Sequence, residues 1–221
     1  MSMSVWILNH YAVSPDMPGG TRHFELGRQL VKLGWDVTIL ASSFNHSQRR
    51  ESRLYGKQSW QVEEIDGVRF VWLRTFPHQG NDWRRALNMS SYFFRSYWAG
   101  RKLPKSNPSI PVPDAIIGSS VHLLAVISAI LLARHFHSSF IMEVRDLWPQ
   151  TLVDMGRLSE RSLATRMLRY LEKWLYRRAE KIIVLLPRAG EYITGLGIDP
   201  KKVRWIPNGV DLTRFPSHPP S

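Results

Sequence analysis

The chain has 221 residues, 43% of them hydrophobic and 22% charged, which is enough apolar sequence to bury the core of one large domain. It contains no cysteine, which excludes a disulfide framework and any zinc site built on cysteine. Thirty Lys and Arg against 18 Asp and Glu give a net charge of +12, so we expect an anionic partner: nucleic acid, anionic lipid or a phosphate-bearing small molecule.

A strand, a flexible turn, a helix and a second strand are predicted at the start of the chain. Residues 5–9 form a short apolar run of strand length, and residues 10–20 follow as a loop with two prolines and a Gly-Gly pair. Apolar residues recur at helical spacing from Thr21 until Gly34, which ends the helix before a strand at 36–41. These elements make a βαβ unit.

An antiparallel hairpin and a long helix are predicted next. Residues 42–57 are polar, rich in Arg and Ser and without periodicity, so we expect a mobile surface loop there. Strand-like segments at 60–65 and 68–73 flank Asp66-Gly67, a two-residue signal of a β-hairpin. A helix is expected over residues 83–103.

The rest of the chain alternates between strands and helices. After a proline-rich connection, strands are expected at 115–118, 140–144, 181–186 and 203–206, and helices at 123–135 and 159–179. Such alternation requires right-handed crossovers and a parallel sheet covered on both faces. The predicted fold class is therefore α/β, a Rossmann-like, mostly parallel sheet with one antiparallel hairpin. It forms a single domain at 1–206, and 207–221 is expected to begin a linker.

Polar residues follow several of these predicted strands. In an open parallel sheet, ligands bind outside the carboxyl ends of the strands, because helix N-termini and loop amides converge there. The residues at these positions are His10, Gly19, Gly20, Ser119, Ser120, His122, Arg145, Asp146 and Asn208. Two histidines, an arginine, an aspartate and a glycine-rich turn at one edge predict a site for a polar, phosphorylated ligand.

Each of these residues also has a purely structural interpretation. The Gly19-Gly20 pair is consistent with a simple turn, and its surroundings differ from the Gly-x-Gly-x-x-Gly of dinucleotide folds, so no NAD site is expected. His122 could cap or pack against a helix, and Arg145 could form an internal ion pair with Asp146. The residues alone leave these alternatives open.

Four sequence segments, in this order, resemble glycosyltransferase family 4, and particularly its bacterial members that build surface polysaccharides. The segments are Pro-Gly-Gly-Thr-Arg-His-Phe-Glu-Leu at 18–26, Ser-Ser-Val-His at 119–122, Glu-Val-Arg-Asp-Leu-Trp-Pro at 143–149 and Ile-Pro-Asn-Gly-Val-Asp at 206–211. The first and last are shared widely in the family, whereas the third is narrower and more telling. The resemblance runs from about Val5 to Phe215.

This resemblance implies the acceptor side of a two-domain (GT-B) glycosyltransferase whose second domain holds a nucleotide-sugar. The residues implied to contact the substrate or the donor diphosphate are Gly19, Gly20, Thr21, Ser120, Glu143 and Asn208, and the implied catalytic residues are His122, Arg145 and Asp146. The resemblance also implies retention of anomeric configuration and transfer of a hexosyl or N-acetylhexosaminyl group from a UDP- or GDP-sugar. The acceptor would be a glycan or a polyprenyl-diphosphate-linked sugar in O-antigen or capsule synthesis, with no cofactor.

The chain departs from the family pattern after Phe215. The family pattern continues there with the donor domain, in which a Glu-x7-Glu pair binds the donor. This domain is missing from these 221 residues. We therefore expect the isolated chain to be inactive and to require a donor half in cis or in trans. Glu172 and Glu180 have the Glu-x7-Glu spacing, but they fall on a basic amphipathic helix and are interpreted as solvated charges. No Asp-x-Asp sequence occurs, so no metal is expected.

The predicted helix at 83–103 combines aromatic with basic residues and has no acidic residue. On a helical wheel, an apolar half is predicted opposite the polar residues Arg84, Asn88, Ser91, Arg95 and Lys102. This pattern is typical of a helix in a lipid interface, and equally of an apolar stripe that packs on a sheet. The residues predicted to contact an anionic membrane are Trp83, Arg84, Arg85, Phe93, Phe94, Arg95 and Trp98.

The sequence also predicts where in the cell the protein lies. Residues 1–9 lack the charged start and long apolar stretch of a secretory signal, and the longest apolar run, 123–133, would reach only about half of a ~30 Å hydrocarbon core as a helix. We therefore expect a cytoplasmic protein, peripheral on the inner face of the cytoplasmic membrane.

The sequence also bears on two other function classes. Nucleic-acid binding is suggested by a pI of about 10.4, but no recognisable nucleic-acid-binding module accompanies it, so no nucleic-acid partner is expected. A non-catalytic interaction domain would keep the fold without chemistry of its own.

Overall fold

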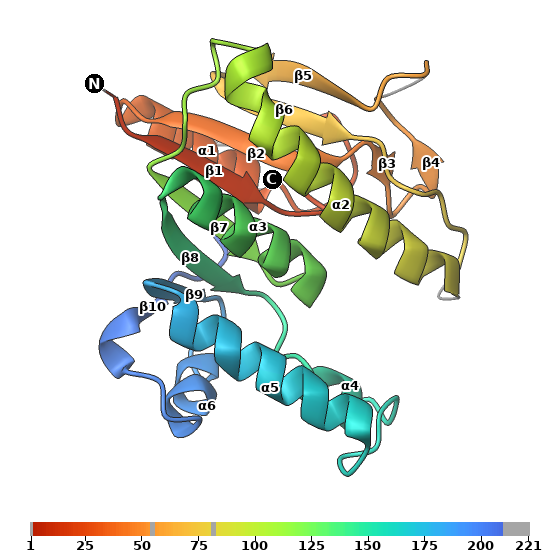
Figure 1. Cartoon of the computed structure of the whole chain (residues 1–221), viewed down its shortest axis with the longest axis vertical. Helices are drawn as coiled ribbons and strands as arrows, with labels where there is room; N and C mark the ends of the chain where they lie inside the picture. The colour runs from red at the N-terminus through yellow and green to blue at the C-terminus, as the bar shows by residue number, and fades with distance from the viewer. Residues whose placement is uncertain (1, 54–55, 81–82, 210–221) are drawn as a thin grey trace, which may run out of the picture.

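The computed structural model describes residues 2–53, 56–80 and 83–209, and its centre is an eight-stranded sheet (Figure 1). The strand order is β10-β9-β8-β7-β1-β2-β6-β5, and every neighbouring pair is parallel except β5 and β6. The strands are β1 Ser4–Leu8, β2 Asp36–Ser42, β5 Trp60–Ile65, β6 Val68–Leu73, β7 Ala115–Ser119, β8 Ser139–Val144, β9 Lys181–Val184 and β10 Val203–Trp205. The predicted α/β fold class with a mostly parallel sheet is confirmed.

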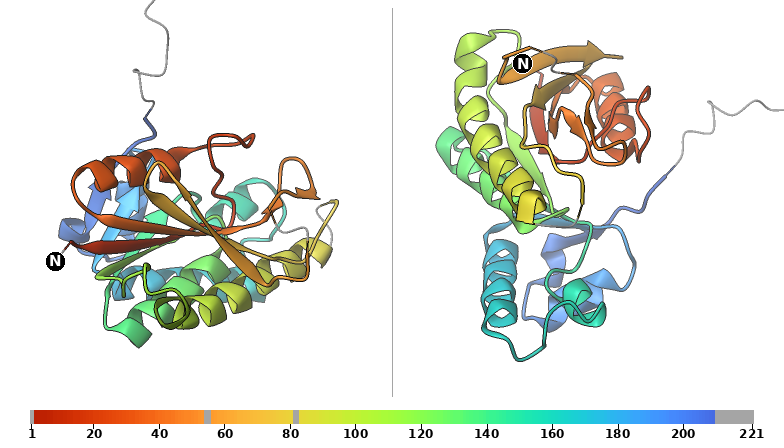
Figure 2. Two further views of the ribbon diagram at one scale, coloured as in Figure 1. Left: turned by 90° about the horizontal axis from the view of Figure 1, so that it is seen from above. Right: turned by 90° about the vertical axis from the view of Figure 1, so that its right-hand side faces the viewer.

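Helices cover both faces of this sheet. They are α1 Arg22–Lys32, α2 Trp83–Ser106, α3 Leu123–Phe136, α4 Gln150–Asp154, α5 Leu163–Arg178 and α6 Ala189–Gly195, with a short 3-10 helix at Pro200–Lys202. Helices α2, α3 and α5 lie on one face and α1 lies on the other (Figures 1 and 2). Among the described residues, none of the helices combines the length and apolar character needed to cross a bilayer.

Two hydrophobic clusters, one on each face of the sheet, form the core. Because successive side chains of a strand point to opposite faces, β1 supplies Trp6 and Leu8 to one cluster and Val5 and Ile7 to the other. All four are buried, as expected for a central parallel strand that helices cover on both sides.

The predicted hairpin is confirmed and forms one edge of the sheet. Strands β5 and β6 pair antiparallel, and both turn residues, Asp66 and Gly67, have positive φ angles of 48° and 78°. Positive φ at both positions gives the turn type whose twist matches the flanking strands.

The expectation of a polar surface loop over 42–57 is wrong for its first residues. Strand β2 continues to Ser42, and β3 Phe44–Asn45 pairs with β4 Arg50–Glu51 in a small second hairpin. The segment from Ser42 to Asn45 is buried, and both of its hydroxyls find partners inside the protein. The hydroxyl of Ser42 lies 2.7 Å from that of Thr75, and the hydroxyl of Ser43 donates to the Leu73 carbonyl at 3.0 Å. A hydrogen-bonded polar side chain can be buried without a large free-energy cost.

Helix α2 has nearly its predicted bounds, but the side that it turns toward the sheet differs from the predicted one. Asn88, predicted to be on the solvent face, is buried and donates from Nδ2 to the Phe76 carbonyl at 2.7 Å. On the same buried side, the hydroxyl of Tyr92 donates to the Leu40 carbonyl at 2.7 Å, and the hydroxyl of Ser96 lies 2.7 Å from that of Ser128. The buried side of α2 therefore combines polar side chains that have partners inside the protein with core residues such as Ala99 and Leu103.

The last third of the chain contains two short helices, α4 and α6, that were not predicted. Helix α5 begins at Leu163, later than expected, because the hydroxyl of Ser162 caps it by accepting from the Thr165 N–H.

The interpretation of Glu172 as a solvated charge is wrong. Its side chain is buried and accepts hydrogen bonds from Tyr176 at 2.8 Å and from Tyr192 at 3.2 Å. Burial raises the pKa of Glu172 to about 7. Glu180, eight positions further on, is exposed as expected.

Candidate functional site

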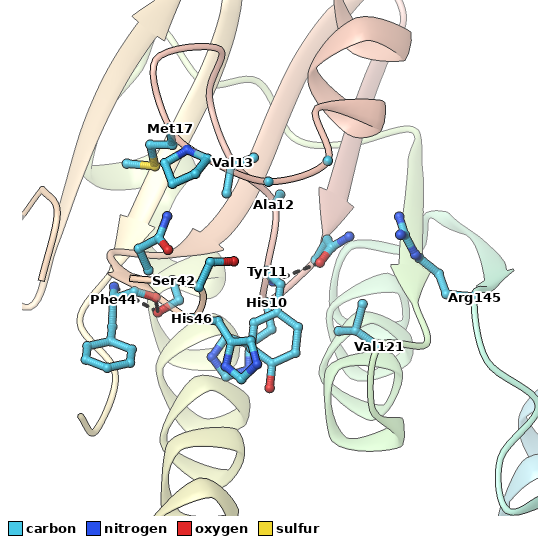
Figure 3. Close-up of a pocket in the computed structure, with 16 residues that line it drawn as sticks. His10, Tyr11, Ala12, Val13, Met17, Ser42, Phe44, His46, Val121 and Arg145 are labelled. Carbon is cyan, nitrogen blue, oxygen red and sulfur yellow. Dashed lines mark hydrogen bonds between the residues drawn. The ribbon is translucent and has the colours of Figure 1, made fainter. Parts of the chain in front are cut away.

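A cavity of about 230 Å³ lies where the strands β1, β2, β7 and β8 end, at the carboxyl edge of the sheet (Figure 3). Residues of the loop after β1 and of the segment from Ser42 to Ser47 line most of it, together with Val121 and Arg145. Of the residues predicted from the sequence, His10, Gly19, Gly20 and Arg145 meet here, so sheet topology brings together groups that are far apart in the chain.

The glycine pair forms one wall of the cavity directly before α1. Gly19 has φ of 141°, and a Cβ at this position would also lie 3.1 Å from a methyl group of Val13. Gly20 has no atom within 4 Å of such a Cβ. Thr21, the residue before α1, makes no side-chain cap, so the first N–H groups of the helix are not occupied by it. A turn of this kind before a helix suits an anionic group.

His122 has both ring nitrogens engaged within the protein. It caps α3, accepting at Nδ1 from the Ala125 N–H at 3.2 Å, which confirms the capping interpretation. Its Nε2 lies 2.8 Å from Nδ1 of His10. Burial, with a smaller effect of Arg85, lowers the pKa of His122 to about 3, so the ring is neutral and its proton is on Nε2. His122 does not line the cavity itself. It contacts His10, which does.

Arg145 and Asp146 are adjacent in sequence but differ in position. Arg145 lines the cavity from the loop after β8, opposite the segment from Ser42 to His46 (Figure 3). Asp146 is exposed, and no ion pair joins these two described residues within 4.0 Å, so the alternative of an internal ion pair is not supported.

Ser120 is buried outside the cavity wall and fixes the Arg145 loop. Its hydroxyl accepts from the Arg145 N–H at 3.0 Å, and its carbonyl accepts from the indole of Trp148 at 3.1 Å. Asn208 is exposed near the end of the described chain, and Val210 and Asp211 of the fourth segment lie outside the described residues.

Glu143 is also buried, and its carboxylate is fully engaged. It accepts from Arg22 at 2.9 Å, from His23 at 2.6 Å and from Ser119 at 2.7 Å. Burial alone would raise the pKa of Glu143, but the attraction to His23 and the three hydrogen bonds hold it well below its usual range. Glu143 is therefore ionised, and it lies behind the cavity rather than on its wall.

Arg22 connects three of the segments that carry the family resemblance. Besides Glu143, its guanidinium donates to the carbonyls of Ile206 at 2.9 Å and Pro207 at 2.6 Å. Arg22 lies within the first segment, but nothing local in the sequence indicates its role. Its partner Glu143 lies in the third segment and both carbonyls lie in the fourth, and an ion pair between distant segments leaves no local signal.

The sequence profile of the glycosyl transferase 4-like domain matches residues 19–209. The chain belongs to this family. A comparison with curated proteins gives no significant match.

Solved structures show the same fold as this glycosyl transferase 4-like domain. Sucrose-phosphate synthase from Thermosynechococcus elongatus aligns with a TM-score of 0.67 at 16% identity, over 96% of this chain and 50% of that one. The catalytic domain of starch synthase IV from Arabidopsis thaliana, bound to ADP and acarbose, gives 0.59 at 13% identity, over 96% and 52%. Arabidopsis thaliana UGT89C1 complexed with UDP gives 0.56 at 14% identity, over 93% and 51%.

The glycosyl transferase 4-like domain thus spans about half the length of these structures. The predicted likeness to the N-terminal half of a GT-B glycosyltransferase is confirmed at the level of family and fold.

Proposed function

We propose that this domain is the acceptor-binding half of a retaining glycosyltransferase that moves a sugar from a nucleotide-sugar, such as a UDP- or GDP-sugar, to a glycan or lipid-linked acceptor. The observation that carries the proposal is the cavity at the carboxyl edge of the sheet. There the Gly19-Gly20 turn, Arg145 and the histidine-bearing loops meet in a chain of this family.

The chemistry of transfer gives each part of the cavity a task. A departing nucleoside diphosphate is stabilised by cationic groups and backbone amides, which Arg145 and the turn before α1 provide. An acceptor hydroxyl must be held in line with the sugar, a task for the polar groups at the His10 and His46 end. The donor half supplies the nucleotide pocket and closes the site against water.

The finer assignment follows the sequence resemblance. The Glu-Val-Arg-Asp-Leu-Trp-Pro segment at 143–149 supports a hexosyl or N-acetylhexosaminyl transferase of bacterial surface polysaccharide synthesis, making O-antigen or capsule. In that setting the acceptor is carried on a polyprenyl diphosphate, and the enzyme works in the cytoplasm at the inner face of the membrane.

The exposed side of α2 supports this membrane placement. Trp83, Phe94 and Trp98 are 65%, 57% and 54% exposed, and their spacing puts them on one side of the helix together with Leu87. Arg101 lies over the rings of Tyr97 and Trp98. Exposed aromatic side chains beside basic ones are typical of a helix at a lipid interface.

Two other residues predicted for membrane contact contribute less to this exposed side. Phe93 is half-buried, and Arg85 acts electrostatically on His10, His46 and His122, so it belongs to the cavity side of α2. Arg84 and Arg95 remain beside the exposed aromatic side chains, and Arg95 lines a groove with Phe94 and Trp98.

The experiment that tests the function is reconstitution. The chain is joined to a family donor half, either the one encoded after it or one from a related enzyme, and supplied with UDP- and GDP-sugars and polyprenyl-diphosphate-linked acceptors. We expect transfer from one of these donors, with NMR of the product showing the anomeric configuration of the donor. Inverted configuration, or hydrolysis without transfer from every donor, would contradict the proposal.

A further inference from the structure

Four histidines from four segments meet beside the cavity, and we call them the histidine cluster: His10, His46, His78 and His122. Nδ1 of His10 lies 2.8 Å from Nε2 of His122, and Nδ1 of His46 lies 3.2 Å from Nε2 of His78. The ring of Tyr11 joins the two pairs, since it stacks on His10 and lies 4.8 Å from the ring of His46. His10 and His46 both line the cavity.

The ring of His10 is fixed in position. It is stacked between Tyr11 and Tyr92, with centroids 4.4 Å away on each side and interplanar angles of 20° and 8°. Tyr92 is itself held by its hydrogen bond to the Leu40 carbonyl. The direction of each nitrogen of His10 is therefore set by the fold.

The hydrogen-bond chain also fixes the tautomer of His10. The Ala125 N–H occupies Nδ1 of His122, so Nε2 of His122 carries a proton and donates it to Nδ1 of His10. The proton of neutral His10 is then on Nε2. This nitrogen is buried, and it has no hydrogen-bond partner among the described residues. A buried donor without a partner is unfavourable, and an acceptor atom of a ligand at this position would relieve that cost.

Arg85 places a fixed positive charge beside the cluster. Burial is the main cause that lowers the pKa of His10, followed by electrostatic effects of His122, His46, His78 and Arg85. Burial also lowers the pKa of His46, with contributions from Arg85, His78 and Arg49. Negative charge on a ligand would oppose these effects, because it stabilises protonated imidazole.

A metal ion is a poorer match for the cluster. The direct hydrogen bond between His10 and His122 uses nitrogens that a metal would need. Within the described residues no group of three or more His, Cys, Asp or Glu side chains is arranged to hold a metal ion.

We infer that the end of the cavity at His10 and His46 is a subsite for an oxyanion, either a phosphate or a carboxylate. This oxyanion accepts a hydrogen bond from His10 Nε2 and is paired with the charge of Arg85. His122 is a positioning residue, which acts by holding His10 in the donor tautomer. Assigning this anion to the acceptor, as the phosphate of its lipid carrier or the carboxylate of an acidic sugar, rests on the proposed function. Arg145 and the glycine turn then serve the donor diphosphate at the other end.

The test uses the 221-residue chain with ¹⁵N-labelled histidine. NMR of the free protein should show His10 protonated at Nε2, and sulfate, a phosphate mimic with constant charge in this pH range, should shift the His10 and His46 signals saturably. Because neutral His10 already carries the donated proton on Nε2, we expect sulfate to bind at both pH 6 and pH 8 without proton uptake at His10. Glucuronate is the carboxylate probe, and whichever probe binds more tightly indicates the source of the anion.

Two variants and a control make the test specific. We expect His10→Phe, which keeps the ring stacking but removes the N–H, and Arg85→Gln each to weaken binding about 10-fold or more. Lys32→Gln, at the exposed far end of α1, should change it less than about 2-fold. The subsite is wrong if neither probe gives saturable shifts, or if His10 is protonated at Nδ1. Failure of sugar transfer in the reconstituted enzyme, with the shifts intact, would instead contradict the proposed function alone.

Discussion

At the scale of single residues, Arg22 is the main link between segments that are distant in sequence. It pairs with the buried carboxylate of Glu143 and also binds the carbonyls of Ile206 and Pro207, where the chain leaves the sheet. Removing one partner of a buried ion pair leaves the other charge without compensation, which is far more destabilising than breaking an exposed pair.

We therefore predict that Arg22→Gln lowers the free energy of unfolding by about 3 kcal/mol, measured by urea denaturation at pH 7. Arg28→Gln is the matched control on the same helix, because Arg28 pairs with the more accessible Glu25. It should cost less than about 1 kcal/mol. Equal effects of the two substitutions would show that the Glu143 network does not stabilise the fold.

Glu172 makes a prediction about pH. Its folded-state pKa of about 7 lies above the ordinary value of 4.5, so the native protein retains a proton that the unfolded chain releases as pH rises from about 4.5 to 7. This group therefore contributes a stability that is fully present at low pH and is lost as pH rises through 7. Glu172→Gln removes this titration, so the variant does not lose stability in this way as pH rises. The free energy of unfolding of the variant minus that of the parent should therefore increase by roughly 3 kcal/mol between pH 5 and pH 8.

Urea unfolding of both proteins at several pH values measures this difference. Glu180→Gln serves as the control, because Glu180 is exposed and its substitution should leave the pH dependence unchanged. Parallel stability curves for Glu172→Gln and the parent would contradict the account of a buried, protonated carboxyl group.

Sequence reasoning identified several cavity residues correctly but missed others for a physical reason. His10 and Arg145 closely follow strands, and Gly19 lies in the loop between β1 and α1, so strand topology was enough to place them at one edge. His46 and His78 lie on irregular segments beyond β2 and β6, and Arg85 lies on a helix that sequence analysis assigned to the membrane. Their convergence depends on packing between elements, which residue type and spacing do not encode.

At the scale of elements, α2 shows where hydrophobic periodicity fails. Its extent was predicted almost correctly, yet Asn88 and Ser96 are buried while Trp83 and Trp98 are exposed. The wheel placed Asn88 on the exposed polar face, whereas hydrogen bonds to neighbouring elements let polar residues of this helix pack inside.

This exposed aromatic side gives a membrane prediction. The parent chain should cosediment with liposomes rich in anionic lipid at low salt and be released at high salt. The triple substitution Trp83→Ser, Phe94→Ser and Trp98→Ser should lower the bound fraction about 10-fold, because each removes an exposed apolar group.

Trp205→Ser is the control for this experiment. Trp205 is also exposed, at 57%, but it lies on β10 away from α2. It should leave liposome binding unchanged. If the parent does not bind anionic liposomes at low salt, or if the triple variant binds as well as the parent, α2 is not a membrane-contacting element.

At the scale of the whole molecule, alternation of strands and helices was sufficient to predict the parallel sheet. Each long buried strand and each helix of more than ten residues was anticipated, because such elements carry a clear periodic signal. The helices α4 and α6, with five and seven residues, are too short to show one. The small β3–β4 hairpin was missed because its strands have two residues each.

The proposed function requires that the sugar is transferred at the cavity. Arg145 lines it and is assigned to the donor diphosphate, whereas Lys32 is exposed at the opposite end of α1. The direct measurement is the rate of sugar transfer by the reconstituted enzyme carrying Arg145→Gln or Lys32→Gln. We predict a loss of about 100-fold for Arg145→Gln and less than about 2-fold for Lys32→Gln. Full activity of Arg145→Gln would contradict the assignment of this cavity as the transfer site.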